Sequence, residues 1–197
     1  VASNENPLGP SPLAMEALKQ AIPSVYLYPD GASTRLRDKI AHEFLVDKDQ
    51  IICGNGSDEL LVLAAGAYIE NGLNAVTSET TFSEYTFSAT LFGGEMRYAP
   101  MKDGKFDLSR ILSLVDDNTR VVNLCNPNNP TGTYYTQKEL ESFMREIPDY
   151  VLVVVDEAYA EYAQAEDFPK TKELLNTYKN LLILRTFSKI YGLAGLR

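Results

Sequence analysis

The chain contains 197 residues, of which 45% are apolar and 23% are charged, as is typical of a globular protein and not of a disordered one. A formal net charge of −9 argues against a nucleic acid or an anionic membrane as the main partner, because both are bound by basic faces. Two cysteines and one histidine, without paired spacing, give neither a disulfide framework nor a zinc cluster, so we expect no metal site.

The start of the chain leads to expectations about location and organisation. It carries no leader-like segment, and no apolar run is long enough to span a membrane, so we expect a protein of the reducing cytoplasm. An initiator methionine is lacking, and we expect a fragment at both ends. Because the first dozen residues are rich in proline, we assign residues 1–25 to an N-terminal arm and residues 26–197 to part of one large domain.

Strand-like and helical patterns alternate along the rest of the chain. We expect strands at residues 50–55, 74–79, 95–100, 120–127, 150–159 and 181–187. We expect helices at residues 57–70, 82–94, 107–119 and 136–148. This alternation predicts the α/β class, with a mostly parallel sheet between helices. In such sheets functional groups lie just beyond the carboxyl ends of the strands.

The first unusual turn, CGNGSDE, follows the first predicted strand and leads into a helix. Its glycines allow close backbone approach, and the amides of Ser57 and Asp58 at the helix start can bind a phosphate. On its own, the turn fits an ordinary capped strand-to-helix connection better than a phosphate site. It lacks the GxGxxG and Walker spacings, which argues against dinucleotides and nucleoside triphosphates.

Two further turns carry polar groups at predicted strand ends. NPNNPTG is stiffened by two prolines, and Asn129 is its best-placed side chain for a ligand; a rigid turn satisfied by asparagines is the alternative. In VLVVVDEAY, an apolar strand ends at Asp156, with Tyr159 three residues later. A carboxylate so placed is costly to desolvate, which predicts a paired cation or strong donor. The alternative is a capping aspartate followed by a core tyrosine.

The last turn, RTFSKIYGLAGLR, surrounds Lys189 with Thr186, Ser188 and Arg197. Two hydroxyls and a guanidinium suit a phosphate monoester, and a lysine in such a place can bond covalently to an aldehyde. The alternative is a lysine whose stem lies along a helix start. Taken together, the four turns specify pyridoxal 5′-phosphate, although no single turn does.

Six motifs in this order (SNENPLGPSP, YPDG, GNGSDE, NPNNPTG, DEAY and RTFSKIYGLAGLR) resemble the fold-type I pyridoxal-phosphate-dependent aminotransferases, and among them the branch that acts on histidinol phosphate. The resemblance implies that Lys189 bonds to the cofactor and moves the substrate proton, and that Asp156 faces the ring nitrogen. It implies that Asn129 and Tyr159 contact the phenolic oxygen. It assigns the phosphate to Ser57, Asp58, Thr186, Ser188 and Arg197. Tyr28 is expected to reach the cofactor of a second subunit, so the resemblance implies a homodimer.

The chain departs from the family pattern in two respects. Where the family has Pro-Thr-Tyr, this chain has Thr80, Thr81 and Phe82, and we expect Phe82 to stack on the cofactor ring. The family's small C-terminal domain is expected beyond residue 197. Residues 26–197 therefore correspond to most of the cofactor-binding large domain.

The implied reaction is transamination between L-histidinol phosphate and 2-oxoglutarate, which yields glutamate, in histidine biosynthesis. An aromatic amino acid aminotransferase and a threonine-phosphate decarboxylase are the alternatives within the fold. A phosphate-binding module without activity would not need both Lys189 and Asp156. A DNA-binding regulator would need a basic helix-turn-helix, which the sequence lacks.

Overall fold

The computed structural model describes residues 3–196 and divides into two compact units. We call Ser57–Thr186 the sheet unit, and the described parts of Val1–Gly56 and Phe187–Arg197 the terminal unit. Within the described residues, no helix combines the length and apolar character needed to cross a membrane.

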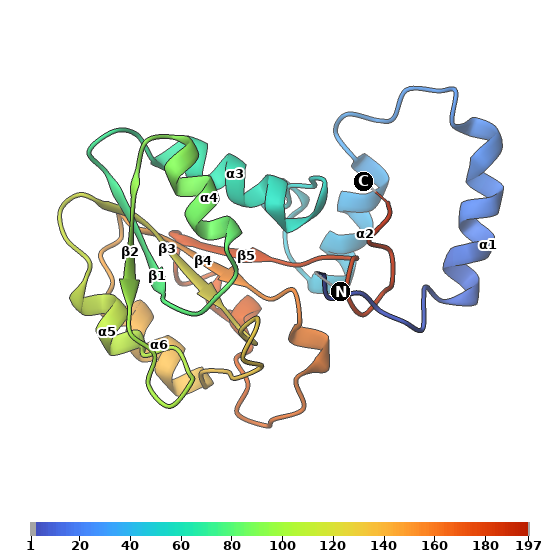
Figure 1. Ribbon diagram of the computed structural model, residues 1–197. Coiled ribbons are helices and arrows are strands. Elements are labelled where there is room, and N and C mark those ends of the chain that lie inside the picture. Colours follow the sequence, from blue (N-terminus) through green and yellow to red (C-terminus); the bar gives the residue numbers. More distant parts are fainter. Residues whose placement is uncertain (1–2, 197) are drawn as a thin grey trace. The chain divides into compact units, whose positions relative to one another are not determined.

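The sheet unit is built on five parallel strands in the order β2-β1-β3-β4-β5 (Figure 1), which confirms the predicted α/β class. The strands are β1 (Asn74–Ser78), β2 (Glu95–Ala99), β3 (Thr119–Cys125), β4 (Leu152–Asp156) and β5 (Leu181–Leu184). The register pairs Cys125 with Asp156 and Asp156 with Leu184. The last residues of three strands are therefore aligned at one edge of the sheet.

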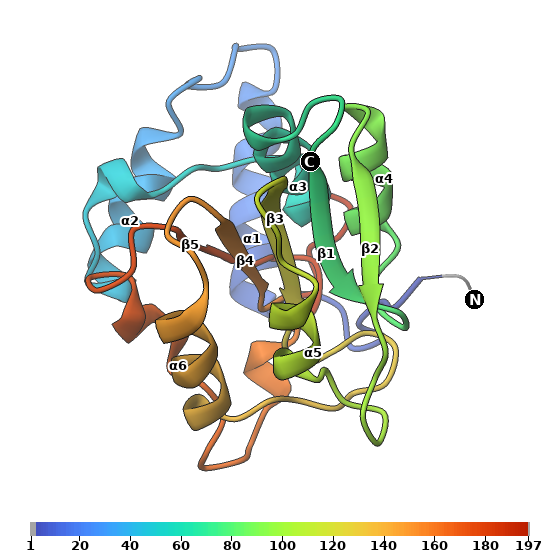
Figure 2. The ribbon, with the colours of Figure 1, turned by 90° about the vertical axis from the view of Figure 1, so that its left-hand side faces the viewer.

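Helices cover both faces of this sheet (Figure 2). The helices are α3 (Gly56–Tyr68), α4 (Glu84–Leu91), α5 (Leu108–Ser113) and α6 (Gln137–Glu146), followed by short 3₁₀ helices at Ala160–Tyr162 and Thr171–Leu174. In the views, α3 and α4 lie on one face, and α5 and α6 on the other. At the start of α6, Thr136 and Glu139 form a capping box, which fixes where this helix begins.

The core lies around the two central strands. Val122, Leu124 and Val153 are fully buried, and every residue of β4 is buried. Five of the six strand predictions are confirmed, and β4 shows the continuous apolar run of a parallel strand covered on both faces.

The strand predicted at residues 50–55 is wrong. A 3₁₀ helix (Lys48–Gln50) ends there, and residues 51–55 belong to no strand. The run is short, and Ile52 is 69% exposed, so its apolar side chains do not enter a sheet.

The terminal unit contains two helices that were not predicted, α1 (Pro12–Ala21) and α2 (Thr34–Phe44), and a 3₁₀ helix at Ile22–Ser24. Residues 3–11 contain neither helix nor strand, but they include a turn in which the Gly9 amide donates to the Asn6 carbonyl (3.1 Å). Helix α1 begins where Ser11 caps it, with a proline in its first turn. The division into an arm of residues 1–25 and a domain of residues 26–197 remains a prediction.

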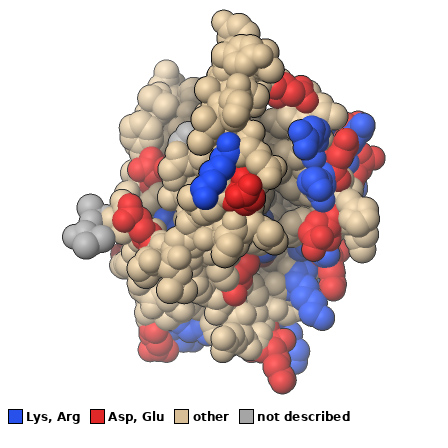
Figure 3. Space-filling view, turned by 90° about the vertical axis from the view of Figure 1, so that its right-hand side faces the viewer, with Lys and Arg blue, Asp and Glu red and all other residues tan. Residues whose placement is uncertain are grey.

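Large apolar side chains of the terminal unit lie at its surface. Leu13, Val25 and Tyr26 are about four-fifths exposed, and Tyr28 is fully exposed. Figure 3 looks onto the side that carries α1, and uncharged residues cover a large part of that face. Exposed apolar side chains such as Leu13, Val25 and Tyr26 are typical of a contact region.

Candidate active site

The loops that follow β1 and β3 meet at the point where the order of the sheet reverses. The chain passes from β1 to β2 on one side and then to β3 on the other. Thr81 Oγ1 donates a hydrogen bond to Asn128 Oδ1 (2.8 Å), and Asn128 Nδ2 donates one to the carbonyl of Thr80 (2.9 Å). Because ligands of open α/β sheets bind at such a reversal, this edge is the candidate site.

Asp156 ends β4 at this edge and is only 3% exposed. Tyr85 Oη donates to Asp156 Oδ2 (2.8 Å), and the amide of Ala158 donates to Oδ1 (3.1 Å). Burial raises the pKa of Asp156 to about 6, although both hydrogen bonds act in the opposite direction. Both donors are uncharged, so a cation at this carboxylate would favour its ionised form.

Tyr85 is a site residue that the sequence analysis missed. It lies in the first turn of α4 and is 1% exposed. Its ring meets the ring of Phe82 edge-on, with centroids 5.8 Å apart and an interplanar angle of 83°. Phe82 is therefore held next to the residue that binds Asp156. Its place in the predicted helix at residues 82–94 did not single it out as a site residue.

The asparagine-rich loop combines the two interpretations that the sequence left open. Asn126 satisfies the turn: its Oδ1 accepts from the amide of Tyr135 (3.0 Å), and its Nδ2 donates to the carbonyl of Tyr135 (3.3 Å). Asn128 joins the two loops, as described above. Asn129 is half-buried, and its backbone amide donates to Cys125 Sγ (3.4 Å). The contact of its side chain with a ligand stays a prediction. Burial raises the pKa of the Cys125 thiol to about 12.

An ion-pair cluster joins the chain after β4 to the chain after β5. Arg185 Nη1 lies 2.7 Å from Glu157 Oε2, and Nη2 lies 2.9 Å from Glu161 Oε1. The Glu157 side chain is 5% exposed, and burial raises its pKa while Arg185 lowers it. The cluster fixes the ends of the two strands that lead to Tyr159 and Thr186, both of which are half-buried.

The start of α3 carries features of both interpretations of the glycine turn. Gly56 has φ +80°, which favours glycine, and its amide donates to the carbonyl of Gly54 (2.9 Å). Helix starts present free amides to anions, as the phosphate interpretation requires. The first turn also contains Asp58 and Glu59, which stabilise a helix start without any ligand.

In the terminal unit, the loop of Lys189 packs against the beginning of the chain. Lys189 Nζ donates to the carbonyl of Asn4 (2.9 Å), and Asn6 Nδ2 donates to the carbonyl of Ile190 (2.8 Å). Gly192 has φ +66°, and a Cβ at this position would lie 2.5 Å from the Gly9 carbonyl carbon and oxygen. The approach of these two backbones therefore requires glycine at 192.

The predicted site residues are thus distributed over both units. The terminal unit holds Tyr28, Ser188 and Lys189; the sheet unit holds Ser57, Asp58, Phe82, Asn129, Asp156, Tyr159 and Thr186. Arg197 lies outside the described residues. Between residues 3 and 196, no group of three or more histidine, cysteine, aspartate or glutamate side chains is suited to a metal ion.

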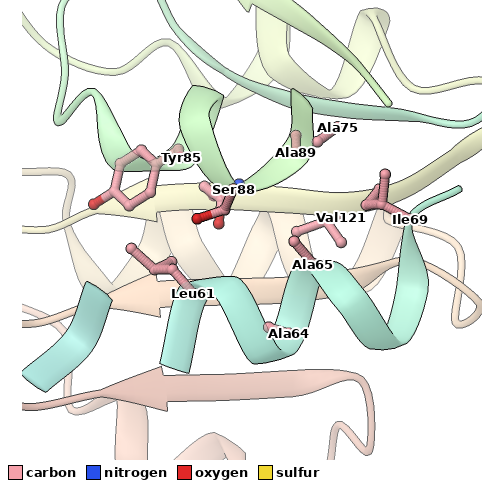
Figure 4. A pocket seen from close by; sticks show the side chains of 10 residues that line it. Leu61, Ala64, Ala65, Ile69, Ala75, Tyr85, Ser88, Ala89 and Val121 are labelled. Carbon is pink, nitrogen blue, oxygen red and sulfur yellow. The ribbon is translucent and has the colours of Figure 1, made fainter. Parts of the chain in front are cut away.

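A small cavity lies behind the candidate site, between α3, α4 and the sheet (Figure 4). Leu61 and Ala65 of α3, Tyr85 and Ser88 of α4, and Val121 of β3 contribute to its lining. Its volume of about 10 Å³ leaves room for one water molecule at most, so it does not accommodate a cofactor. Tyr85 forms part of this lining and is shielded from solvent, with 1% of its surface exposed.

Comparison with known proteins gives a consistent result. All of residues 1–197 match the family described as aminotransferase class I and II. The histidinol-phosphate aminotransferases of Halalkalibacterium halodurans and Anoxybacillus flavithermus are each 49% identical to the chain over 197 residues. This chain spans about half the length of these curated relatives, covering 53% of each.

A solved structure shows the same likeness. The histidinol-phosphate aminotransferase of Sinorhizobium meliloti, in complex with pyridoxal-5′-phosphate, superposes with a TM-score of 0.94 at 32% identity. The match covers 99% of this chain and 53% of that one.

Proposed function

From the premise that this chain belongs to the aminotransferase class I and II family, we propose that it forms the cofactor-binding part of a pyridoxal-phosphate-dependent aminotransferase. The proposed reaction transfers the amino group of L-histidinol phosphate to 2-oxoglutarate, in histidine biosynthesis. The names of the relatives at 49% identity support this substrate.

One observation of the structure carries the proposal: the buried carboxylate of Asp156. It lies at the end of β4 with two uncharged hydrogen-bond donors, and burial raises its pKa to about 6. The protonated ring nitrogen of pyridoxal phosphate supplies the cation that such a carboxylate favours. The carboxylate at this edge of the sheet therefore fits the ring nitrogen of the cofactor. A phosphate-binding module without this cofactor has no use for the buried charge.

The remaining contacts are assigned by the motifs that carry them. Phe82 would stack on the ring, Asn129 and Tyr159 would bind the phenolic oxygen, and Lys189 would bond to the aldehyde. The phosphate would be held by Ser57, Asp58, Thr186, Ser188 and Arg197. When bound, the cofactor serves as an electron sink for the pair left on the substrate carbon.

The chain's own residues then have distinct tasks. Asp156 places a negative charge at the ring nitrogen and keeps the nitrogen protonated. Once the substrate amine has displaced it from the aldehyde, the Lys189 amine would take the proton from the substrate α-carbon and deliver it to the carbon that belonged to the aldehyde. Asn129 and Tyr159 orient the ring, so that the proton moves over a short, fixed path.

We further propose a homodimer in the cytoplasm. Tyr28 is fully exposed and lies beside other exposed apolar residues of the terminal unit, as expected of a segment that contacts a second subunit. The part of the enzyme beyond this chain would cover further apolar surface. Residues 1–197 alone are therefore expected to lack transamination activity.

The test is a comparison of amino donors with the complete gene product. We expect L-histidinol phosphate to give the highest kcat/KM, well above those of phenylalanine and tyrosine, with 2-oxoglutarate as acceptor. A Lys189→Ala variant is the control and is expected to be inactive. Preference for an aromatic amino acid would refute the substrate, and decarboxylation of threonine phosphate would refute the reaction.

A further inference from the structure

We propose that Tyr85 is a positioning residue that aligns both Asp156 and Phe82 with the ring of the cofactor. The inference rests on the proposed function, because it takes pyridoxal phosphate as the ligand of the edge at which β4 ends. Tyr85 itself is not assigned a contact with the cofactor.

The hydroxyl group of Tyr85 fixes the carboxylate. It donates to Asp156 Oδ2 at 2.8 Å, across 71 positions of sequence, while the amide of Ala158 holds Oδ1. With each oxygen bound once, the carboxylate plane has a defined orientation. Each oxygen keeps a further lone pair, so one of them can still accept from the ring nitrogen.

The ring of Tyr85 fixes the aromatic contact. Phe82 meets it edge-on at 5.8 Å, a geometry that aromatic pairs prefer. Phe82 is half-buried in a loop that lacks the proline of the family pattern, and the Tyr85 ring is one of the contacts that can hold it in place. Tyr85 therefore contacts both Asp156, which is assigned to the ring nitrogen of the cofactor, and Phe82, which is assigned to the face of the ring.

Tyr85 is suited to this task because it is itself held firmly. It is 1% exposed on α4 and packs at the cavity lined by Leu61, Ala65 and Val121. Figure 4 shows its ring pointing along the space between α3 and α4, with the hydroxyl at the far end. A residue locked by packing can transmit its position to the groups that it contacts.

The charged and titratable groups around Asp156 make the hydroxyl important for its ionisation as well. The negative charges of Asp58 of α3 and of Glu157 both disfavour ionisation of Asp156. Cys125 of β3 and Tyr135 also lie within electrostatic reach of Asp156. Loss of the Tyr85 hydrogen bond removes the largest influence that favours the carboxylate form.

The test compares two conservative variants of the complete gene product. Tyr85→Phe removes the hydroxyl and keeps the ring. Tyr135→Phe is the matched control, because Tyr135 is equally buried and its hydroxyl has no hydrogen-bond partner among the described residues. Binding of pyridoxal phosphate is titrated by absorbance between pH 6 and 8.5, and each variant is expressed as a ratio to the wild type.

We expect Tyr85→Phe to weaken cofactor binding about ten-fold near pH 7, as loss of a hydrogen bond to a charged group would. The loss should grow as the pH falls, because the carboxylate then protonates more readily. Tyr135→Phe should stay within about two-fold of wild type at every pH. Tyr85→Leu, which also releases Phe82, should bind more weakly than Tyr85→Phe; if it does not fold, the two phenylalanine variants decide the matter.

The outcomes separate this inference from the proposed function. If the wild type binds pyridoxal phosphate and Tyr85→Phe matches it in affinity and pH profile, the positioning role is refuted and the function stands. If both phenylalanine variants weaken binding equally, the effect is one of general packing and the inference also fails. If the wild type itself does not bind the cofactor, the proposed function fails and this inference with it.

Discussion

Replacing Asp156 by asparagine should change how the stability of the cofactor-free protein depends on pH. The pKa of the buried carboxyl is raised from an ordinary value of 3.8 to about 6. A group whose pKa is raised by folding stabilises the folded protein below its unfolded pKa, and this contribution is lost as the pH rises through the folded value. Wild type should therefore lose stability from this group between about pH 4 and pH 7.

The size of the effect follows from the pKa shift. A difference of about two pKa units, at about 1.4 kcal/mol per unit, amounts to about 3 kcal/mol in total. Asparagine does not titrate, so the variant lacks this term. Its carbonyl oxygen can accept from the Ala158 amide and its NH₂ can donate to Tyr85 Oη, because a hydroxyl group can also accept; any remaining difference in hydrogen bonding is the same at every pH.

The assay is urea denaturation of wild type and Asp156→Asn at intervals from pH 4 to pH 7.5. The free energy of unfolding of the variant minus that of wild type should rise by about 2–3 kcal/mol over this range. Other carboxylates titrate in both proteins and cancel in the difference. A difference that stays flat, or that falls with rising pH, would show that Asp156 is not a buried carboxyl with a raised pKa.

Three further predictions concern the surroundings of the site. Arg185→Met should lower the free energy of unfolding, measured by urea denaturation, by about 2 kcal/mol, because it leaves the Glu157 carboxylate buried without its cation. The full value for a buried ion pair does not apply, because the Arg185 side chain is 34% exposed. Recovery of stability on adding Glu157→Gln would support this cause. Hydrogen bonds from Asn74 and Arg97 hold the pKa of Asp116 well below its usual range, and the stabilisation that they give is lost when Asp116 is protonated. In Asp116→Asn the thermal midpoint should therefore fall less steeply below pH 4 than in wild type, and an unchanged acid profile would contradict this. Gly192→Ala should speed amide exchange at residues 3–11 and 187–193, because its Cβ would displace the Gly9 backbone, and unchanged exchange would show that the two segments do not pack.

The sequence was sufficient for the sheet and for the strand that carries Asp156. Val153, Val154 and Val155 lie in a strand covered on both faces, which gives a continuous apolar run of the right length. The same rule misled at Ile51 and Ile52, because apolar character alone does not show whether a sheet partner is present. Helix α1 was missed because the prolines near the start of the chain favoured an extended arm, although proline is tolerated in the first turn of a helix. Helix α2 was not predicted, and none of its residues is buried.

The role of Tyr85 could not be read from the sequence, for a different reason. Its hydroxyl meets a carboxylate 71 positions away, and only the packing of α4 on the sheet brings them together. In the sequence it was one of the apolar positions of a predicted helix. The motif of Asp156 identified a charge in need of partners, but it did not identify the partner that the chain supplies.

The most direct test of the account is to find which residue bonds to the cofactor. The complete gene product is loaded with pyridoxal phosphate, reduced with borohydride, digested and mapped by mass spectrometry. The account predicts one modified residue, Lys189, and no modified lysine in the Lys189→Ala variant. Modification at another lysine, such as Lys170 or Lys179, or no modification of the wild type, would contradict the assignment of the site.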